Sequence, residues 1–251
     1  MFRIVTTVLA VILFAQTAHA SGGACTTFTD QAAFEEFVLA SGKFMKGLET
    51  FEEGVIDDGG KQPMPAPLAG GVPNVIGDFG FPDGLSEPNL VIQDNITPGP
   101  SPAAPNPSGS PVALYLIGAG FIGTNSKKVG EDLEILEQIE ASTDLIFVES
   151  NKTAVGFELS HFDGFGNGDW HISAFDENDV LLGKWVLPDP GIVEPTKTFF
   201  GIFCNTAIGR INIWDVGLIP DAVDNIQMWE LDDPTSVDAS SWGTVKARYV
   251  D

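Results

Sequence analysis

Basic residues and cysteines are scarce in this sequence. Of its 251 residues, 12 are lysine or arginine, 35 are aspartate or glutamate and 2 are cysteine, and the formal net charge is -23. A surface this acidic repels nucleic acid and anionic membranes, so we expect neither as a partner. The same charge favours divalent cations, but it also serves solubility alone, and composition does not separate these two interpretations.

The common signatures of catalysis are also missing. The sequence contains no Gly-x-Ser-x-Gly, no His-Glu-x-x-His and no P-loop pattern. Abundant carboxylates leave a glycosidase-like pair open, and Glu158 and Asp169 on neighbouring predicted strands are its candidates. We therefore predict a protein that is not an enzyme, with a polysaccharide-acting enzyme as an alternative.

Long hydrophobic runs are confined to the first twenty residues. Residues 1–20 combine Arg3, an apolar segment from Ile4 to Phe14 and the small-x-small sequence Ala18-His19-Ala20, which is the pattern of a secretory signal peptide. The apolar segment is shorter than the ~20 residues that a membrane-spanning helix needs. We therefore expect export to the cell surface or the medium, without an integral membrane span in the mature chain.

The two cysteines, Cys25 and Cys204, both follow the predicted leader. Export would place them in an oxidising compartment, where thiols pair into disulfides. We expect a Cys25–Cys204 bridge, which would tie the N-terminal segment to the later strands. The alternative is two free thiols.

Composition divides the remaining chain into one domain and a tail. Residues 21–231 are enough for one all-β domain or two small ones, and we predict a single β-sandwich. A segment at about 94–111, rich in proline and glycine, interrupts this domain as a binding loop or as a surface insertion. Residues 232–251 fall outside the strand pattern, and we interpret them as a C-terminal tail.

Helical periodicity is found in one short segment near the N-terminus. Thr29 or Asp30 can serve as the N-cap, and Phe34, Phe37 and Val38 follow at helical spacing. A Ser-Gly pair then provides an end signal. The pattern predicts one amphipathic helix over Asp30–Ala40.

Short strands account for the rest of the pattern. Leu48–Glu53 is a candidate first strand, Ala154–His161 alternates apolar and polar residues, and Asp176–Asp179 is a turn between two strands. The stretch Phe199–Leu231 contains three further strands. We predict an all-β fold, an antiparallel two-sheet β-sandwich of jelly-roll type, whose first and last strands lie side by side.

Six short motifs follow one another in a recognisable order: TTFTDQAAFEEF, LETFEE, AVGFEL, HISAFDENDVLLG, FFGIF and AVDNIQMWE. This set resembles exported bacterial β-sandwich proteins of the PEP-CTERM-associated type, over most of residues 26–231. The sorting tail of those proteins is absent here, because the C-terminal residues contain no Pro-Glu-Pro, apolar helix or basic cluster. The resemblance implies an exported β-sandwich.

A looser similarity connects the chain with calcium-binding jelly-roll carbohydrate-binding modules. In those modules, a glutamate after an early phenylalanine and an aspartate before the last strand bind a structural calcium, and the matching positions here are Phe51-Glu52 and Asp224-Asn225. Asp224 also shares the strand parity of Ile226, which predicts an inward carboxylate that needs compensation. We expect Ca²⁺ bound by Glu52 and Asp224, with Glu49 or alternatively Glu53 as a further ligand, unless Asp224 instead caps a turn.

Tryptophans on the predicted strands are candidates for a sugar-binding face. An indole is flat and amphipathic and stacks on sugar rings, and we select Trp170 and Trp214 as ligand-binding residues, although core packing is the alternative. His161 and His171 flank a glycine-rich loop at 163–169. They are a candidate zinc pair, although packed or solvent-facing histidines would give the same pattern.

These observations predict an exported, non-catalytic β-sandwich with a structural calcium site. Its expected ligand is a polysaccharide or another component of an extracellular matrix. A purely structural surface or matrix protein is an alternative, as is the polysaccharide-acting enzyme with a carboxylate pair.

Overall fold

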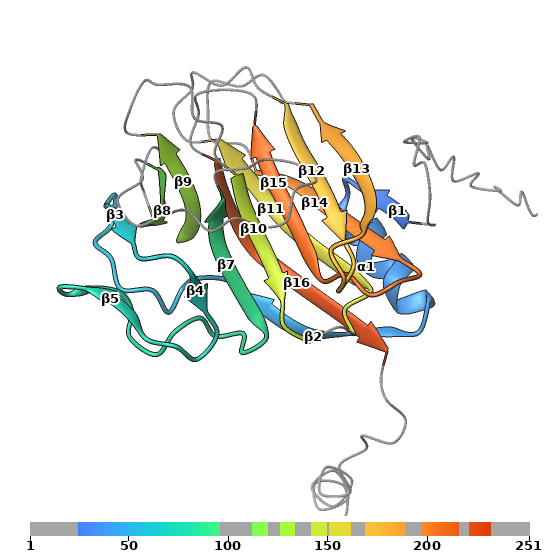
Figure 1. The fold of residues 1–251 in the computed structure, drawn as a ribbon, viewed down its shortest axis with the longest axis horizontal. Coiled ribbons are helices and arrows are strands. Elements are labelled where there is room, and N and C mark those ends of the chain that lie inside the picture. The colour runs from blue at the N-terminus through green and yellow to red at the C-terminus, as the bar shows by residue number, and fades with distance from the viewer. Residues whose placement is uncertain are drawn as a thin grey trace, which may run out of the picture.

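The computed structural model describes residues 25–95, 112–119, 126–133, 142–149, 151–161, 169–188, 197–215 and 221–231. The predicted leader, the tail at 232–251, most of the Pro/Gly-rich segment and most of the glycine-rich loop lie outside the described residues. Figure 1 shows the described elements as two layers of strands with one helix at the side.

The larger layer is an eight-stranded sheet with the order β1-β14-β11-β16-β9-β8-β3, and β2 pairs with β16 as well. Its strands are β1 (Cys25–Phe28), β2 (Lys43–Glu49), β3 (Lys61–Met64), β8 (Val112–Ile117), β9 (Lys128–Leu133), β11 (Ala154–His161), β14 (Lys197–Cys204) and β16 (Asp221–Leu231).

The second layer is a six-stranded sheet with the order β13-β12-β15-β10-β7-β4. Its strands are β4 (Leu68–Ala69), β7 (Leu90–Asn95), β10 (Ser142–Phe147), β12 (Trp170–Phe175), β13 (Leu181–Leu187) and β15 (Arg210–Asp215). A separate hairpin is formed by β5 (Asn74–Ile76) and β6 (Phe79–Phe81). All strand pairs in these sheets are antiparallel, which confirms the predicted two-sheet β-sandwich.

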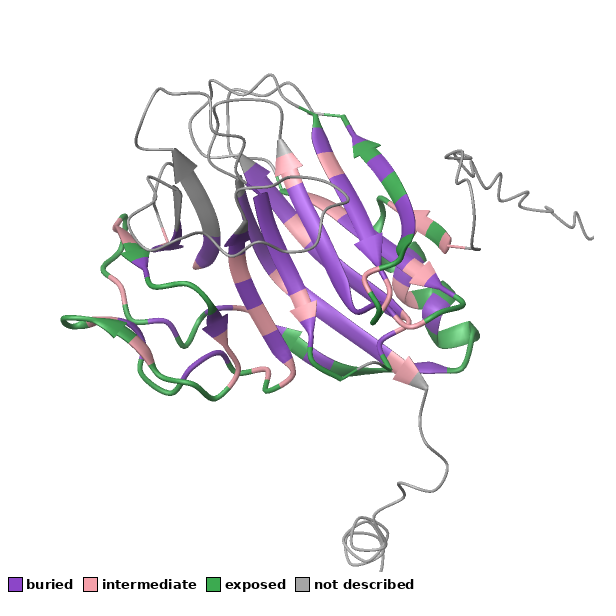
Figure 2. Cartoon of the chain, viewed as in Figure 1, coloured by how far each residue is buried: buried purple, intermediate pink, exposed green. Residues whose placement is uncertain are grey.

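The hydrophobic core lies between the two sheets. Alternation on β11 places Val155, Phe157 and Leu159 on the inner face, and on β12 it places Trp170 and Ile172 there. Figure 2 shows the buried residues concentrated on these central strands. The period-two pattern in the sequence is therefore the signal of burial against the opposite sheet.

The helix α1 (Gln31–Ala40) covers the outer face of the eight-stranded sheet. Of the two predicted cap residues, Asp30 is the N-cap, and its carboxylate accepts a hydrogen bond of 2.8 Å from the Ala33 amide. The ring of Phe34 packs over Gly156 and Gly201, two glycines that face each other across β11 and β14. Glycine is needed at both positions because a side chain there would occupy the space of this ring.

The predicted first strand, Leu48–Glu53, is placed incorrectly. Strand β2 begins at Lys43 and ends at Glu49, and the left-handed conformation of Phe51, with φ of 59°, is incompatible with a continuing strand. Ile226 nevertheless lies opposite Glu49, so the early strand β2 and the last strand β16 are side by side, as predicted.

The three strands predicted within Phe199–Leu231 are β14, β15 and β16, but they do not form one continuous ribbon. Strands β14 and β16 belong to the eight-stranded sheet with β11 between them, whereas β15 belongs to the other sheet. The chain therefore crosses the core twice in this stretch. The predicted turn at Asp176–Asp179 does connect β12 to β13, and Asp176 accepts hydrogen bonds from the amides of Asn178 and Val180.

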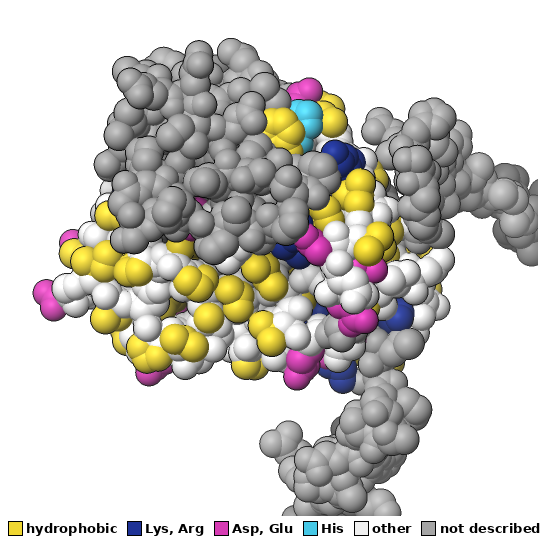
Figure 3. Space-filling view, viewed as in Figure 1, with side chains coloured by type: hydrophobic (Ala, Val, Ile, Leu, Met, Phe, Trp, Pro, Cys, Tyr) yellow, Lys and Arg dark blue, Asp and Glu magenta, His cyan; other side chains and the backbone are white. Residues whose placement is uncertain are grey.

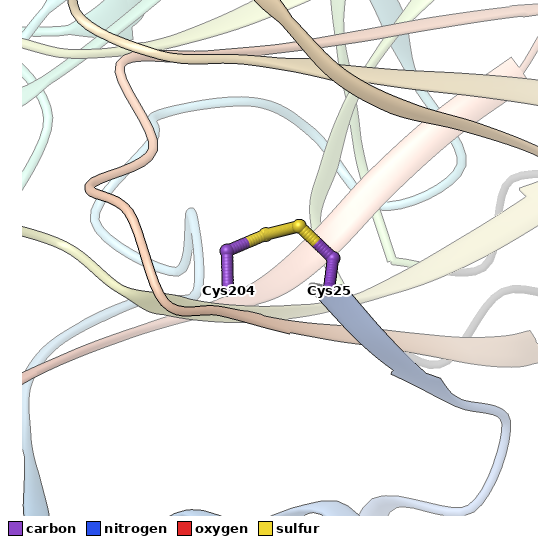
Figure 4. Close-up of a disulfide and its surroundings, with 2 residues drawn as sticks. All are labelled: Cys25 and Cys204. Atoms are coloured by element: carbon purple, nitrogen blue, oxygen red, sulfur yellow. A yellow bond between two sulfur atoms is a disulfide. The ribbon is translucent and has the colours of Figure 1, made fainter. Parts of the chain in front are cut away.

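A disulfide joins Cys25 to Cys204, as expected from the sequence. Figure 4 shows this bridge between β1 and β14, where the two cysteines are register partners at the edge of the sheet. The bridge fixes the N-terminal strand to a strand 179 positions away.

Candidate functional site

The outer face of the six-stranded sheet carries two adjacent rows of polar and aromatic side chains. His171, Trp214 and Ser142 are register partners across β12, β15 and β10. The neighbouring row contains Ser173, Asn212 and Asp144 on the same three strands. These residues alternate with core residues such as Ile172 and Ile213, so both rows point away from the core.

Trp214 is the half-buried aromatic residue of this face. Its indole stacks on the His171 imidazole, with 4.3 Å between ring centroids and an interplanar angle of 25°. This separation is close to the ~4.8 Å between neighbouring strands, so the two rings stand side by side on the sheet. The second face of the indole is therefore turned toward β10, where its register partner is the small residue Ser142.

A buried hydrogen-bond network lies in the neighbouring row. The Asn212 amide nitrogen donates to Asp144 Oδ1 at 2.8 Å and to Ser142 Oγ at 3.0 Å. Arg210 donates to Asp144 Oδ1 at 2.9 Å and to Asp179 Oδ1 at 2.6 Å. All of these side chains except Asp179 are buried, and a satisfied network of this kind holds a single arrangement.

The charge of Arg210 is compensated in two ways. Its two carboxylate partners form ion pairs, and its guanidinium lies over the Phe175 ring with 3.9 Å between Cζ and the ring centroid. The side of this face formed by β13 is more open, because Val186, the register partner of His171, is 54% exposed. Figure 3 shows a histidine beside hydrophobic side chains near the upper edge of this face.

Trp170 was also predicted to bind ligand, and the structure corrects this. The side chain is 0% exposed and belongs to the core between the sheets. It shares the parity of Ile172 and Ala174, whereas Trp214 has the opposite parity to Ile213. A residue inside the core has no surface on which a sugar could stack, so Trp214 is the candidate that remains.

Asp224 is buried, but on the opposite side of its sheet from the one predicted. Strand β16 pairs with β11 through Asp224 opposite Glu158 and Gln227 opposite Gly156. Between these two pairs, β16 contains one residue more than β11. The extra residue forms a β-bulge at Asn225, which has a φ of 50°. A bulge inverts the alternation, so Val223 joins the core cluster and Asp224 faces outward.

The compensation for the Asp224 carboxylate comes from lysines. Its Oδ2 lies 3.3 Å from Lys128 Nζ and 3.2 Å from Lys197 Nζ, and Ser126 Oγ donates to it at 2.7 Å. A buried carboxylate needs a partner, and the two lysines that fill this role lie 96 and 27 positions away from Asp224 along the chain. Sequence proximity therefore could not reveal them.

The donor set found here does not fit the calcium clamp expected from Glu52 and Asp224. Glu52 is exposed and accepts a hydrogen bond of 3.1 Å from the amide of Lys127, and two ammonium groups at Asp224 oppose a divalent cation. Among the residues that the structure describes, no group of three or more His, Cys, Asp or Glu side chains is arranged to hold a metal ion. Calcium binding itself stays a prediction.

Glu49, the third expected ligand, is enclosed at the end of β2. Its carboxylate accepts hydrogen bonds from the amides of Phe51 and Glu87 at 2.9 and 3.1 Å and from Ser86 Oγ at 2.9 Å. Burial, followed by a hydrogen bond with Glu53, raises the pKa of Glu49 to about 7. Part of the population is therefore protonated at neutral pH, and the carboxyl group is already surrounded by hydrogen-bond donors of the protein itself.

The remaining candidate pairs are divided between the two sheets. Glu158 is on β11 of the eight-stranded sheet and bonds to Lys197 and Asn225, whereas Asp169 immediately precedes β12 of the other sheet. His161 and His171 are separated in the same way, and His171 stacks on an indole. These strands are neighbours along the chain but not within a sheet, so the predicted carboxylate and zinc pairs are not register partners.

Comparison with known proteins gives similarity at the level of architecture. No protein-family model and no curated protein sequence matches the chain. The K1 cleaved adhesin domain of Lys-gingipain from Porphyromonas gingivalis has 12% sequence identity and a TM-score of 0.39, over 74% of this chain and 96% of that domain. The K3 cleaved adhesin domain has 12% identity and a TM-score of 0.38, over 74% and 98%.

A family 29 carbohydrate-binding module is also similar, with 11% identity and a TM-score of 0.33, over 59% of this chain and 98% of the module. Matches of this size carry no argument about function, so the proposal below rests on the chain's own residues. They do not bear on the PEP-CTERM resemblance, which stays a prediction. Among the described residues there is no helix that is long and apolar enough to span a membrane.

Proposed function

We propose that this protein is an exported, non-catalytic β-sandwich that binds polysaccharide through the outer face of its six-stranded sheet. The observation that carries the proposal is the half-buried indole of Trp214, stacked on His171 and lying beside the buried network of Asn212, Asp144 and Arg210. A polysaccharide or another glycan of an extracellular matrix is the expected ligand class.

The chemistry of a sugar ring matches this surface. A pyranose has an apolar C–H face and a polar rim, and an indole offers a flat apolar surface with one N–H donor. Because His171 already fixes the ring of Trp214 from one side, binding to the exposed part of the indole would immobilise few additional torsions. A rigid aromatic platform therefore supports binding without a deep pocket.

A binding role fits the carboxylates of this face better than a catalytic role. Asp144 and Asp179 are both engaged in ion pairs with Arg210. Both carboxylates are thus occupied by the guanidinium group and are not free to act on a substrate. Export is supported by the leader pattern of residues 1–20 and by the Cys25–Cys204 disulfide, which belongs to an oxidising compartment.

Affinity electrophoresis tests this proposal. Native gels containing neutral polysaccharides, namely a β-glucan, a mannan and a xylan, avoid repulsion by the net charge of -23. We expect at least one of them to retard the wild-type protein, and we expect Trp214→Ala to weaken that retardation about tenfold, the equivalent of about 1.4 kcal/mol.

A matched control is Phe44→Ala, which removes an aromatic ring that is 47% exposed on β2 of the other sheet. This variant should be retarded like the wild type. If Trp214→Ala and Phe44→Ala behave alike, or if the wild type runs freely in all of the gels, the binding proposal is wrong and a structural matrix role becomes the better one. Release of reducing ends from the polysaccharide would instead favour the enzyme alternative.

A further inference from the structure

Lys128 and Asp224 form an ion pair that is almost completely removed from water. Ala222 pairs with Gly130 and Val223 with Val129, so the next step of the β9–β16 ladder places Lys128 opposite Asp224. Both side chains are 1% exposed, and 3.3 Å separates Lys128 Nζ from Asp224 Oδ2. An amine and a carboxyl group are thus held together in a dry environment.

The surroundings of the Asp224 carboxyl group distinguish its two oxygens. Oδ1 accepts a hydrogen bond of 2.8 Å from the backbone amide of Asn225, in the bulge of β16. Oδ2 receives the Ser126 hydroxyl at 2.7 Å and lies 3.2 Å from Lys197 Nζ. One oxygen therefore faces a fixed dipole that can stabilise a developing negative charge, and the other faces groups that can donate a proton.

The charges of this cluster favour a change in which Lys128 and Asp224 both become neutral. Lys128, Lys197, Asp224 and Glu158 carry two positive and two negative charges, and Lys197 Nζ lies 2.8 Å from Glu158 Oε2. Loss of the Lys128 and Asp224 charges would leave one matched, partly exposed ion pair. It would also remove two charges from an environment in which ions are poorly solvated.

We propose that Lys128 and Asp224 condense to an intramolecular amide bond that links β9 to β16. Lys128 Nζ gives up a proton and attacks Asp224 Cγ, so that the N–C bond forms and the electron pair moves to Oδ1. The tetrahedral intermediate collapses, the Cγ–Oδ2 bond breaks and Oδ2 leaves as water with two protons from the ammonium group. Ammonium and carboxylate thus become amide and water, and no other reactant is consumed.

The neighbouring residues have defined roles in this step. The Asn225 amide stabilises the charge on Oδ1, while Lys197 and Ser126 relay protons to the leaving Oδ2. Burial lowers the pKa of Lys128, although the Asp224 charge acts in the opposite direction. The lowered pKa increases the fraction of neutral amine, which is the form that is able to attack. Glu158 holds Lys197 in place through its ion pair.

The link would reinforce a weak part of the sheet. The described ladder between β9 and β16 contains only two register pairs, Ala222 with Gly130 and Val223 with Val129. A covalent bond between residues 96 positions apart closes a long loop, and unlike the Cys25–Cys204 disulfide it resists reductants. For a protein that works outside the cell, this is a second permanent connection.

Peptide mapping of the folded, full-length protein tests the proposal. After reduction and proteolysis, we expect the Lys128 and Asp224 peptides to appear as one linked species, with a mass one water below the sum of the two. Separate peptides of full mass would overturn the proposal and leave a buried ion pair only. A succinimide at Asp224 also loses one water but links no peptides, so that result would overturn it as well.

Two variants assign the nucleophile. Lys128→Arg keeps the positive charge without a nucleophilic amine, and the linked species should disappear. Lys152→Arg is the matched control, because Lys152 is also buried but lies 3.6 Å from Glu230 and 3.8 Å from Glu149 in ordinary ion pairs. The linked species should persist in Lys152→Arg. A link that survives in Lys128→Arg, for example one formed by Lys197, would contradict the assignment of Lys128 as the nucleophile.

Discussion

Replacement of Glu49 by glutamine should change how the stability of the protein depends on pH. The wild-type carboxyl group is 0% exposed, and burial together with a hydrogen bond to Glu53 raises its pKa from 4.5 to about 7. In the unfolded chain, Glu49 titrates near its ordinary value, so between these two values the folded state binds more protons than the unfolded state.

The sign and size of the effect follow from this difference. Stability contributed by the protonated form is fully present below the unfolded pKa and is lost as the pH rises through the folded pKa. A rise from 4.5 to about 7 corresponds to about 3 kcal/mol lost between acidic and mildly alkaline solution. Glutamine stays neutral at every pH, so Glu49→Gln should remove this loss. Its NH2 group cannot accept the hydrogen bonds that one of the carboxylate oxygens accepts, which lowers stability by an amount that does not depend on pH.

Urea unfolding measured from pH 4 to pH 9 provides the assay. Between pH 4 and pH 8, we expect the free energy of unfolding of Glu49→Gln to fall by about 3 kcal/mol less than that of the wild type. Glu36→Gln, at an exposed position of α1, is the control and should leave the wild-type profile unchanged. Parallel profiles for Glu49→Gln and the wild type would refute the reasoning.

Three further predictions concern the helix, the disulfide and calcium. Gly201→Ala should lower the free energy of unfolding by ~1–3 kcal/mol, because the new Cβ would lie 2.6 Å from Phe34 Cδ2; unchanged urea midpoints would contradict this. Replacing Cys25 and Cys204 by alanine should cost about 2–5 kcal/mol in the same assay, since the bridge closes a loop of 179 positions, and a smaller loss would show that the bridge contributes little. EDTA should leave the melting temperature unchanged because lysines neutralise Asp224, whereas a rise with added Ca²⁺ would restore the calcium clamp.

Local patterns in the sequence predicted much of the fold. The N-cap Asp30, the alternation over Ala154–His161 and the turn at Asp176–Asp179 each depend on neighbours a few positions away, and all three were found. Strand β1 was missed because it is defined by its pairing with β14, which lies far along the chain. Pairing of this kind leaves no periodic signal in four residues.

The candidate site shows the same division between local and distant information. Alternation along β15 is enough to place Arg210, Asn212 and Trp214 on one face, but it could not supply Asp144 of β10 as the partner of Arg210 and Asn212. At Asp224 the parity rule failed, because a single left-handed residue in β16 inverted the alternation. A bulge cannot be located from hydrophobic periodicity alone.

The most direct test of the proposed binding face is a ¹⁵N-indole NMR titration of the wild-type protein with the polysaccharide that retards it in native gels. Among the five tryptophans, we expect the indole N–H signal of Trp214 to shift on binding, while that of Trp170, which is fully buried between the sheets, stays in place. A bound complex in which the signal of Trp214 does not move, or in which only other tryptophans respond, would contradict the account.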